Sequence, residues 1–130
     1  MKYSSLVAKP RILFVCGRNQ LRSPTAEEVY RRDPRLDVRS AGVSPSSRQR
    51  VTEKSLQWSS LVLAMERKHA ARIREQFDYL NELPPIKSLD IPDEYQFMDA
   101  ELIGLIRDRV EPILASLAEE LDAGEDLIER

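Results

Sequence analysis

The only cysteine of this 130-residue chain stands among residues that a structural cysteine does not need. In the stretch ILFVCGRNQLRSPTAEE, residues 12–28, Cys16 ends an apolar run and is followed by Asn19 and Arg22. A loop at this position can turn its backbone N–H groups toward an anion, and an arginine can bind two phosphate oxygens at once. The same positive surroundings stabilise a thiolate. The pattern Cys-x5-Arg therefore predicts an anion-binding loop with a sulfur nucleophile suited to attack on phosphorus.

Such a loop needs a strand before it and a helix after it. The run RILFVC, Arg11–Cys16, is typical of a buried strand. Ser23 suits the N-cap of a following helix and Pro24 its first turn, and Asp33-Pro34 should end that helix. Further strands are predicted at Leu36–Ser40, Ser60–Met65 and Ile86–Ile91, with a loop between the first two of these.

Two more helices are predicted in the second half of the chain. The segment ERKHAARIREQF places Ala70, Ile73 and Phe77 at helical spacing. Asp99 can cap the last long helix, which has a sustained apolar stripe and which Pro112 should bend or interrupt.

Strands that alternate with helices predict an α/β fold. We expect a single domain, 1–130, with a four-stranded parallel sheet flanked by helices on both faces and a phosphate-binding loop after the first strand. Residues 1–10 are expected to be frayed, and residues 119–130 to form an acidic tail. Ligands of such folds bind at the carboxyl ends of the strands, where Cys16 would lie.

The composition excludes several other classes. With 42% apolar and 32% charged residues, the chain is typical of a soluble globular protein. No apolar run approaches the roughly 18–20 residues of a membrane span, and no secretory signal is visible. A single cysteine excludes an internal disulfide and a cysteine-rich zinc site. We therefore expect a cytoplasmic protein with no membrane partner.

Charge is unevenly distributed along the chain. Residues 1–75 contain 16 Lys and Arg against 7 Asp and Glu, whereas residues 76–130 contain 4 against 15. The basic residues are scattered and lack interleaved aromatics, so no nucleic-acid partner is expected. We expect instead that the two halves neutralise each other around a positive site for a small anion.

Four motifs in order resemble the low-molecular-weight protein tyrosine phosphatase family, and most closely its short bacterial branch of predicted phosphatases. The first is the apolar strand with Cys16, Asn19, Arg22, Ser23 and Pro24, followed by TAE. The others are SAG at 40–42, LAM at 63–65, and IPDEY, which contains Asp93 and Tyr95. The motifs run from about Arg11 to Val110.

This resemblance implies a role for each matching residue. Cys16 would be the nucleophile, Arg22 would bind phosphoryl oxygens, and Asp93 would be the general acid and base. Ser23 would hydrogen-bond the thiolate, and Asn19 would hold the loop shape in a left-handed conformation. Ser40 and Tyr95 would support the site, and no metal or cofactor is needed. The phosphate-binding loop would comprise Gly17, Arg18, Asn19, Gln20, Leu21 and Arg22.

The chain also departs from the family pattern. The family usually has glycine two residues after the cysteine, but here Gly17 comes one residue earlier and Arg18 takes that place. Leu21 stands where many members have a second cysteine, and the acid loop reads Asp-Glu-Tyr instead of Asp-Pro-Tyr. The reaction is still expected, and the substrate is left open.

Several residues have simpler interpretations. Asp93 could be a solvated turn carboxylate, with Asp90 as the acid in its place. Arg18 could be a solvated loop residue or a substrate contact. Trp58 is expected in the core rather than the pocket, and His69, in a charged helix, is expected on the surface without a role.

The leading hypothesis is a phosphomonoester hydrolase, most plausibly for phosphotyrosine, that acts through a phosphocysteine intermediate. Its partner would be a phosphorylated protein or a small phosphomonoester, and phosphate-like oxyanions would inhibit it. The alternatives are a non-catalytic phosphate-binding module of the same fold and a small-molecule phosphatase. An arsenate reductase with an internal thiol relay is excluded, because the chain has no second cysteine. A monomer or weak dimer is expected.

Overall fold

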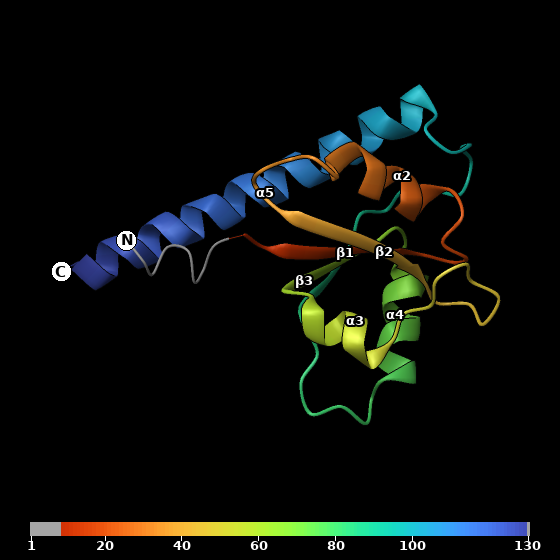
Figure 1. The fold of residues 1–130 in the computed structure, drawn as a ribbon, viewed down its shortest axis with the longest axis horizontal. Helices are drawn as coiled ribbons and strands as arrows, with labels where there is room; N and C mark the ends of the chain where they lie inside the picture. The colour runs from red at the N-terminus through yellow and green to blue at the C-terminus, as the bar shows by residue number, and fades with distance from the viewer. Residues whose placement is uncertain (1–8, 130) are drawn as a thin grey trace.

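The structure, a computed structural model, describes residues 9–129. Within these residues, strands and helices alternate along the chain (Figure 1). This confirms the predicted α/β class. The strands are β1 (Arg11–Cys16), β2 (Asp37–Gly42), β3 (Leu61–Ala64) and β4 (Ile86–Ser88), and the helices are α2 (Arg22–Tyr30), α3 (Glu53–Trp58), α4 (Arg67–Gln76) and α5 (Ala100–Glu129).

The strands form one parallel sheet in the order β2-β1-β3-β4. The central position of β1 follows from its sequence, because Ile12–Val15 is apolar on both faces and is almost fully buried. Strands buried on both faces are typical of parallel sheets covered by helices. The predicted four-stranded parallel sheet with flanking helices is therefore confirmed.

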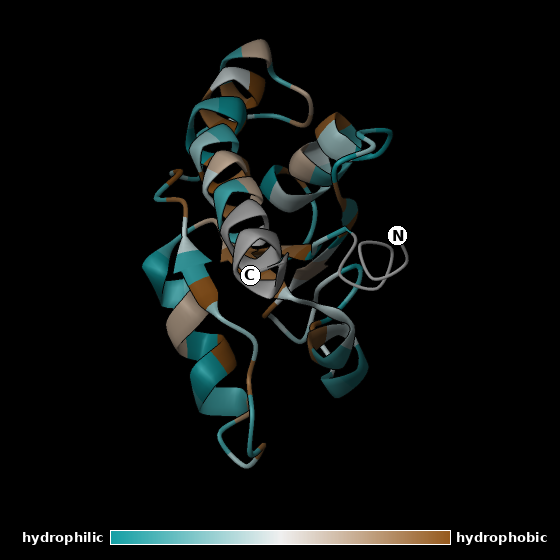
Figure 2. Cartoon of the chain, turned by 90° about the vertical axis from the view of Figure 1, so that its left-hand side faces the viewer, coloured by the Kyte–Doolittle hydropathy of each residue, from teal (hydrophilic) through white to brown (hydrophobic). Residues whose placement is uncertain are grey.

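Each face of the sheet has its own apolar core. Ile12, Phe14 and Cys16 point toward α2 and α5, whereas Leu13 and Val15 point toward α3 and α4. Figure 2 shows apolar residues gathered at the sheet between the helices, while α4 is largely hydrophilic. Burial of each large apolar side chain contributes roughly 1.5–3 kcal/mol. The end of β1 is therefore held from both sides.

Because all strands are parallel, their carboxyl ends meet at one edge of the sheet. Cys16 is the last residue of β1 and pairs with Gly42 at the end of β2. In Figure 1 this edge faces right, whereas β1 begins and α5 ends at the left of the molecule. The residues that follow each strand are thus brought together at the right-hand edge.

Pro112 does not interrupt the last helix, which rules out one of the two predicted effects of this proline. Proline removes one backbone donor, which leaves the carbonyl of Asp108 without its helical partner. Both residues lie on the exposed side of α5, where water can bind that carbonyl. On the buried side, Val110 and Leu114 continue the apolar stripe past the proline. Packing on the buried side therefore lets the helix continue through Pro112. The same helix, α5, extends to Glu129 and so includes residues 119–129 of the predicted acidic tail.

Other predicted boundaries shift by small amounts, and one helix was missed. The short helix α3 lies in the segment between β2 and β3, where no helix was predicted, and Thr52 caps it by accepting from the Ser55 N–H at 3.1 Å. Asp99 lies at the start of α5 as predicted and accepts from the Glu101 N–H at 2.8 Å. Residues 1–8 of the predicted frayed start lie outside the described residues.

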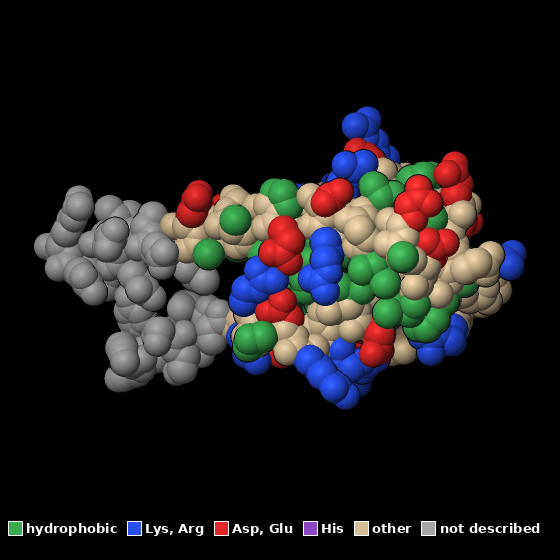
Figure 3. Space-filling view, turned by 90° about the horizontal axis from the view of Figure 1, so that it is seen from above, with side chains coloured by type: hydrophobic (Ala, Val, Ile, Leu, Met, Phe, Trp, Pro, Cys, Tyr) green, Lys and Arg blue, Asp and Glu red, His purple; other side chains and the backbone are tan. Residues whose placement is uncertain are grey.

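Both signs of charge are mixed over the face seen in Figure 3. Three ion pairs join the basic first half to the acidic second half, as expected for halves that neutralise each other. They are Arg22–Asp93, Arg35–Glu111 and Arg67–Asp90. No helix in the described part of the chain is long and apolar enough to cross a membrane.

Candidate active site

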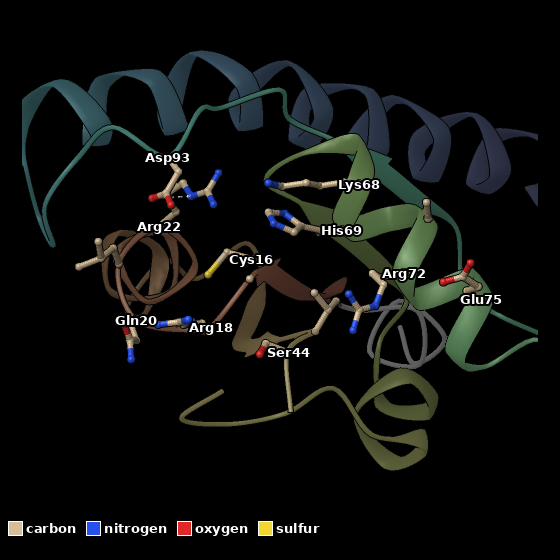
Figure 4. A pocket seen from close by; sticks show the side chains of 14 residues that line it. Cys16, Arg18, Gln20, Arg22, Ser44, Lys68, His69, Arg72, Glu75 and Asp93 are labelled. Atoms are coloured by element: carbon tan, nitrogen blue, oxygen red, sulfur yellow. Dashed lines mark ion pairs between the residues drawn. The ribbon is translucent and has the colours of Figure 1, made fainter. Parts of the chain in front are cut away.

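Cys16 lies at the floor of a cavity at the carboxyl edge of the sheet (Figure 4). Only 3% of the residue is exposed, and its Sγ lies 2.9 Å from the Ser23 hydroxyl oxygen. A hydroxyl that donates to sulfur stabilises the thiolate over the thiol. Ser23 is fully buried inside α2 and does not cap that helix, so its predicted N-cap role is wrong, whereas its predicted contact with the cysteine is present.

The backbone of residues 17–21 is arranged as an anion cradle. Its carbonyls face a neighbouring loop: those of Cys16, Gly17 and Arg18 accept from the N–H groups of Val43, Ser44 and Arg48 at 2.9–3.1 Å. In contrast, the N–H groups of residues 18–21 donate to no acceptor among the described residues. Adjacent unpaired N–H groups at the start of a helix form a binding site for an anion.

Asn19 fixes the shape of this cradle. Its φ of 56° is the left-handed conformation that the sequence predicted for an asparagine at this position. The residue is fully buried, and its Nδ2 donates to the hydroxyls of Ser23 at 3.0 Å and Ser40 at 2.9 Å. Ser40 in turn donates to Glu27. The predicted supporting role of Ser40 thus corresponds to a direct hydrogen bond to the loop.

Gly42 allows the two loops to approach so closely. A Cβ at this position would lie 2.2 Å from the Ser47 Oγ and 2.8 Å from the Gly17 carbonyl oxygen. Any larger residue would therefore push the two loops apart. The second motif of the sequence, SAG, ends on this glycine because only a bare backbone fits there.

Arg22 is held at one side of the cradle with half of its guanidinium unused. The residue is 5% exposed, and its Nη1 donates to the Ile91 carbonyl at 2.8 Å and to Glu66. Its Nε lies 3.7 Å from an Asp93 carboxylate oxygen. The Nε and Nη2 edge makes no hydrogen bond within residues 9–120. This edge is available for two oxygens of a phosphoryl group.

Glu66 and His69 also belong to the site, and the sequence analysis missed both. Glu66 follows β3 and binds Arg22; burial acts to raise its pKa, but the hydrogen bond and charge of Arg22 outweigh burial and lower it. His69 was expected on the surface, but it is 3% exposed and lines the cavity. It lies at the same helical spacing as Ile73, which was a signal for burial.

His69 is oriented by the N-cap of its own helix, Glu66. Its Nδ1 accepts from the Glu66 N–H at 3.1 Å, so the neutral ring carries its proton on Nε2. Burial lowers the pKa of His69 to about 4, and the positive charge of Arg22 acts in the same direction. Its Nε2 lies 3.8 Å from the position a Cβ would take on Gly17. The neutral imidazole therefore presents an N–H beside the loop.

The two candidate acids occupy different places. Asp93 lines the cavity and pairs with Arg22, whereas Asp90 lies 3.6 Å from the Arg67 Nε and accepts from the Ser88 hydroxyl at 2.7 Å. Tyr95 packs partly buried against the α5 side of the core and does not line the cavity. The structure thus brings Asp93 to Cys16 and Arg22, but not Asp90 or Tyr95.

The cavity has a volume of about 700 Å³, and its wall combines charged side chains with apolar surface. None of its lining residues is Phe, Tyr or Trp, and Trp58 packs partly buried against the α3–α4 core under the Arg39 guanidinium, away from the cavity as expected. Among residues 9–120, no group of three His, Cys, Asp or Glu side chains is placed to hold a metal ion. Besides the residues already described, the wall comprises Arg18, Gln20, Leu21, Val43, Ser44, Lys68, Ala71, Arg72 and Glu75.

The four-stranded parallel sheet, with Cys16 at the end of its strand β1, has the fold of solved low-molecular-weight protein tyrosine phosphatases. The YwlE arginine phosphatase from Geobacillus stearothermophilus is similar at 27% identity and a TM-score of 0.62, over 93% of this chain and 97% of that one. YfkJ from Bacillus subtilis is 22% identical, with a TM-score of 0.65 over 87% and 97% of the two chains.

A third solved structure extends the same likeness. It is SP-PTP, the low-molecular-weight protein tyrosine phosphatase from Streptococcus pyogenes, with 18% identity and a TM-score of 0.69 over 87% of this chain and 97% of that one. No protein-family model and no curated protein matches the sequence. The resemblance that the four motifs predicted is thus confirmed by structure.

Proposed function

We propose that this protein is a phosphomonoester hydrolase that transfers the phosphoryl group first to Cys16 and then to water. The observation that carries the proposal is the cradle itself. It combines the unpaired N–H groups of residues 18–21, the open edge of Arg22 and the buried sulfur of Cys16. The N–H groups and the Arg22 guanidinium can bind the oxygens of a phosphoryl group, and the Cys16 sulfur can attack its phosphorus.

In the first step, the Cys16 thiolate attacks phosphorus. The S–P bond forms while the ester O–P bond breaks, and Asp93 gives its proton to the leaving oxygen. The loop N–H groups and Arg22 bind the three other oxygens, whose charge grows in the transition state.

In the second step, water attacks the phosphocysteine. Asp93, now ionised, takes a proton from the water as the O–P bond forms and the S–P bond breaks. Inorganic phosphate leaves, and the electron pair returns to sulfur as the thiolate. Ser23 supports this departure because its hydroxyl lies 2.9 Å from Sγ and can donate to the anion.

For the substrate, the solved structures name two possibilities, phosphotyrosine and phosphoarginine proteins. We infer that phosphotyrosine proteins or small aryl phosphates fit this chain better. The reason is charge: Arg18, Lys68 and Arg72 line the cavity and would repel the guanidinium of a phosphoarginine.

The first test is hydrolysis of p-nitrophenyl phosphate, phosphotyrosine and phosphoarginine by wild type and by Cys16→Ser. We expect wild type to turn over the two aryl esters and to be inhibited by vanadate. Because serine is a much weaker nucleophile here, Cys16→Ser should lose at least about 10³-fold in kcat while still binding phosphate. Substantial turnover by purified Cys16→Ser would contradict the mechanism.

The same measurement addresses the alternative of a non-catalytic phosphate-binding module. That alternative predicts phosphate and vanadate binding by wild type without steady-state turnover of any ester. Binding can be followed by calorimetry in both proteins, so that a misfolded preparation is recognised by its failure to bind. Turnover of all three substrates at similar rates would instead contradict the substrate preference alone.

A further inference from the structure

Beyond the cradle, the cavity carries more positive charge than one phosphoryl group requires. Its lining cations are Arg18, Arg22, Lys68 and Arg72, and its lining carboxylates are Asp93 and Glu75. Arg22 is buried and paired with Glu66 and Asp93, so it serves the cradle. The other three cations are exposed at the rim, where the rest of a substrate would lie.

The helix α4 presents two of these cations on one stripe. Lys68, Ala71, Arg72 and Glu75 follow the spacing i, i+3, i+4 and i+7, which lines one face of a helix. Ala71 leaves room between its longer neighbours. Figure 4 shows Lys68 extending toward the Arg22–Asp93 pair, whereas Arg72 lies farther along the wall. The stripe therefore offers positive charge at a distance from the cradle.

Arg18 faces this stripe from the other side of the cavity (Figure 4). Within residues 9–120, neither Arg18 nor Arg72 makes an ion pair or a side-chain hydrogen bond. Lys68 has one weak contact, 4.0 Å from a Glu66 oxygen. Arg18 stands in the loop where the family usually has glycine, so its charge is a feature of this chain. The rim cations are thus available to a ligand.

We propose that Arg18 and Arg72, assisted by Lys68, form a subsite for a second anionic group on the substrate. This rests on the proposed function and specifies its substrate class: a phosphomonoester with a carboxylate or a second phosphate near the scissile group. The second anion could belong to an acidic phosphopeptide or to a small acidic metabolite, which share this chemistry. Glu75 lies farther along the stripe and carries a negative charge, which would repel an extended anion. The subsite therefore favours a compact second anion close to the scissile group.

The test compares binding of two non-hydrolysable ligands by calorimetry, 4-(phosphonomethyl)benzoate and its neutral carboxamide. Exposed ion pairs are individually weak, and two of them act together here, so wild type should bind the carboxylate roughly 3- to 10-fold more tightly. The double variant R18Q/R72Q should lose this preference. The control is Arg74→Gln, which removes one positive charge from the same helix. Arg74 does not line the cavity, and its side chain donates to the Ile86 carbonyl.

Three results would overturn the subsite: equal affinity of wild type for the two ligands, a preference that survives in R18Q/R72Q, or an equal loss of preference in Arg74→Gln. The last would mean that overall charge alone attracts the carboxylate. Because binding needs no turnover, failure of the hydrolase proposal would leave this comparison intact. The source of the anion is then assigned by kcat/KM for phosphotyrosine peptides with Glu or Gln neighbours against small aryl phosphates with and without a carboxylate.

Discussion

The polar residues around Cys16 are buried, and this determines how they act. Asn19, Arg22, Ser23 and His69 are each at most 5% exposed. Burial without a partner would be costly, and each of them makes at least one hydrogen bond, although the Asn19 Oδ1 has no partner within residues 9–120. Side chains held in this way cannot rearrange at the moment of reaction. The site is therefore organised before any substrate arrives.

His69 is the residue whose charge state is most sharply defined. Its lowered pKa of about 4 means that the folded protein keeps it neutral above about pH 5. The unfolded chain protonates it near 6.5. Between these two values the unfolded state binds the extra proton, so His69 makes the folded protein less stable as the pH falls from 6.5 to 4.

We predict that the His69 ring signals in NMR spectra stay constant from pH 8 to about pH 5.5. The chain has one histidine, so its ring signals need no further assignment. The ¹⁵N shifts should show an Nε2–H tautomer, because Nδ1 accepts from the Glu66 N–H. In concentrated urea the same signals should titrate near 6.5. A folded-state midpoint near 6.5 would contradict both the burial and the orientation of this ring.

At the residue scale, the sequence predicted the site residues that lie close together along the chain. Cys16, Asn19 and Arg22 share one loop, so their spacing alone implies their cooperation. Glu66 and His69 reach the site through β3 and α4, and the charged segment around them is typical of a solvated helix. Their part in the site follows from tertiary packing, which residue spacing within one helix does not reveal.

At the scale of elements, the segment after β4 separates two carboxylates. Leu89 and Ile91 continue the pairing of β4, because their N–H groups donate to the carbonyls of Ala64 and Met65 at 2.8 Å. Asp90 between them has a φ of 53°, so its side chain turns toward Ser88 and Arg67. Asp93, three residues further along the chain, lies in the wall of the cavity.

We predict that Asp93→Asn slows hydrolysis of phenyl phosphate by about 10²–10⁴-fold, the usual range for loss of a general acid. Hydrolysis of p-nitrophenyl phosphate should fall much less, because its leaving group needs little protonation. Asp90→Asn is the matched control, since asparagine tolerates the same positive φ. If Asp90→Asn showed this dependence on the leaving group and Asp93→Asn did not, the acid would be Asp90.

Elements with a recognisable apolar run or stripe were predicted well, and the short helix α3, which has neither, was not. The run Ile12–Val15 is typical of a buried strand, as predicted, and α5 keeps its apolar stripe on both sides of Pro112. The helix α3 has six residues and buries one of them, Leu56, so it has no stripe to recognise. Its start did carry a signal, because Thr52 and Ser55 form a capping box.

At the scale of the whole molecule, a polar cluster fastens α5 to the end of α2. The Arg35 guanidinium contacts Asp33 at 2.7 Å and Glu111 at 2.9 Å, and the Tyr30 hydroxyl donates to Glu111 at 2.9 Å. Arg35 lowers the pKa of both carboxyl groups, and for both its hydrogen bond is the largest cause. Burial and Glu111 together raise the pKa of Tyr30, so the phenol stays a neutral donor.

We predict that Arg35→Gln lowers the free energy of unfolding by about 0.5–1 kcal/mol at pH 7, a range reduced for the solvent exposure of these charges. Because both carboxyl pKa values are depressed in the folded state, this contribution is present above their ordinary values of 3.8 and 4.5 and disappears as the pH falls below them. Urea titrations at pH 7 and pH 3 measure it.

The control for this prediction is Arg31→Gln. Arg31, the C-cap residue of α2, pairs with Glu28 three residues earlier, so its removal should cost about 0.3 kcal/mol or less and leave α5 untouched. A difference between wild type and Arg35→Gln that stays the same at pH 7 and pH 3 would show that the arginine acts through packing instead of charge.

The start of β1 and the end of α5 lie at the left of the molecule, opposite the carboxyl ends of the strands (Figure 1), where Cys16 lines the cavity. A linker, a fluorescent protein or a solid support joined after α5 would therefore stand clear of the mouth that admits the substrate. A protein attached to a sensor surface in this way would present its cavity to solution, where even a folded phosphoprotein could reach it. The same cargo inserted between Val43 and Arg50 would instead block the mouth and detach the loop that holds the cradle's carbonyls.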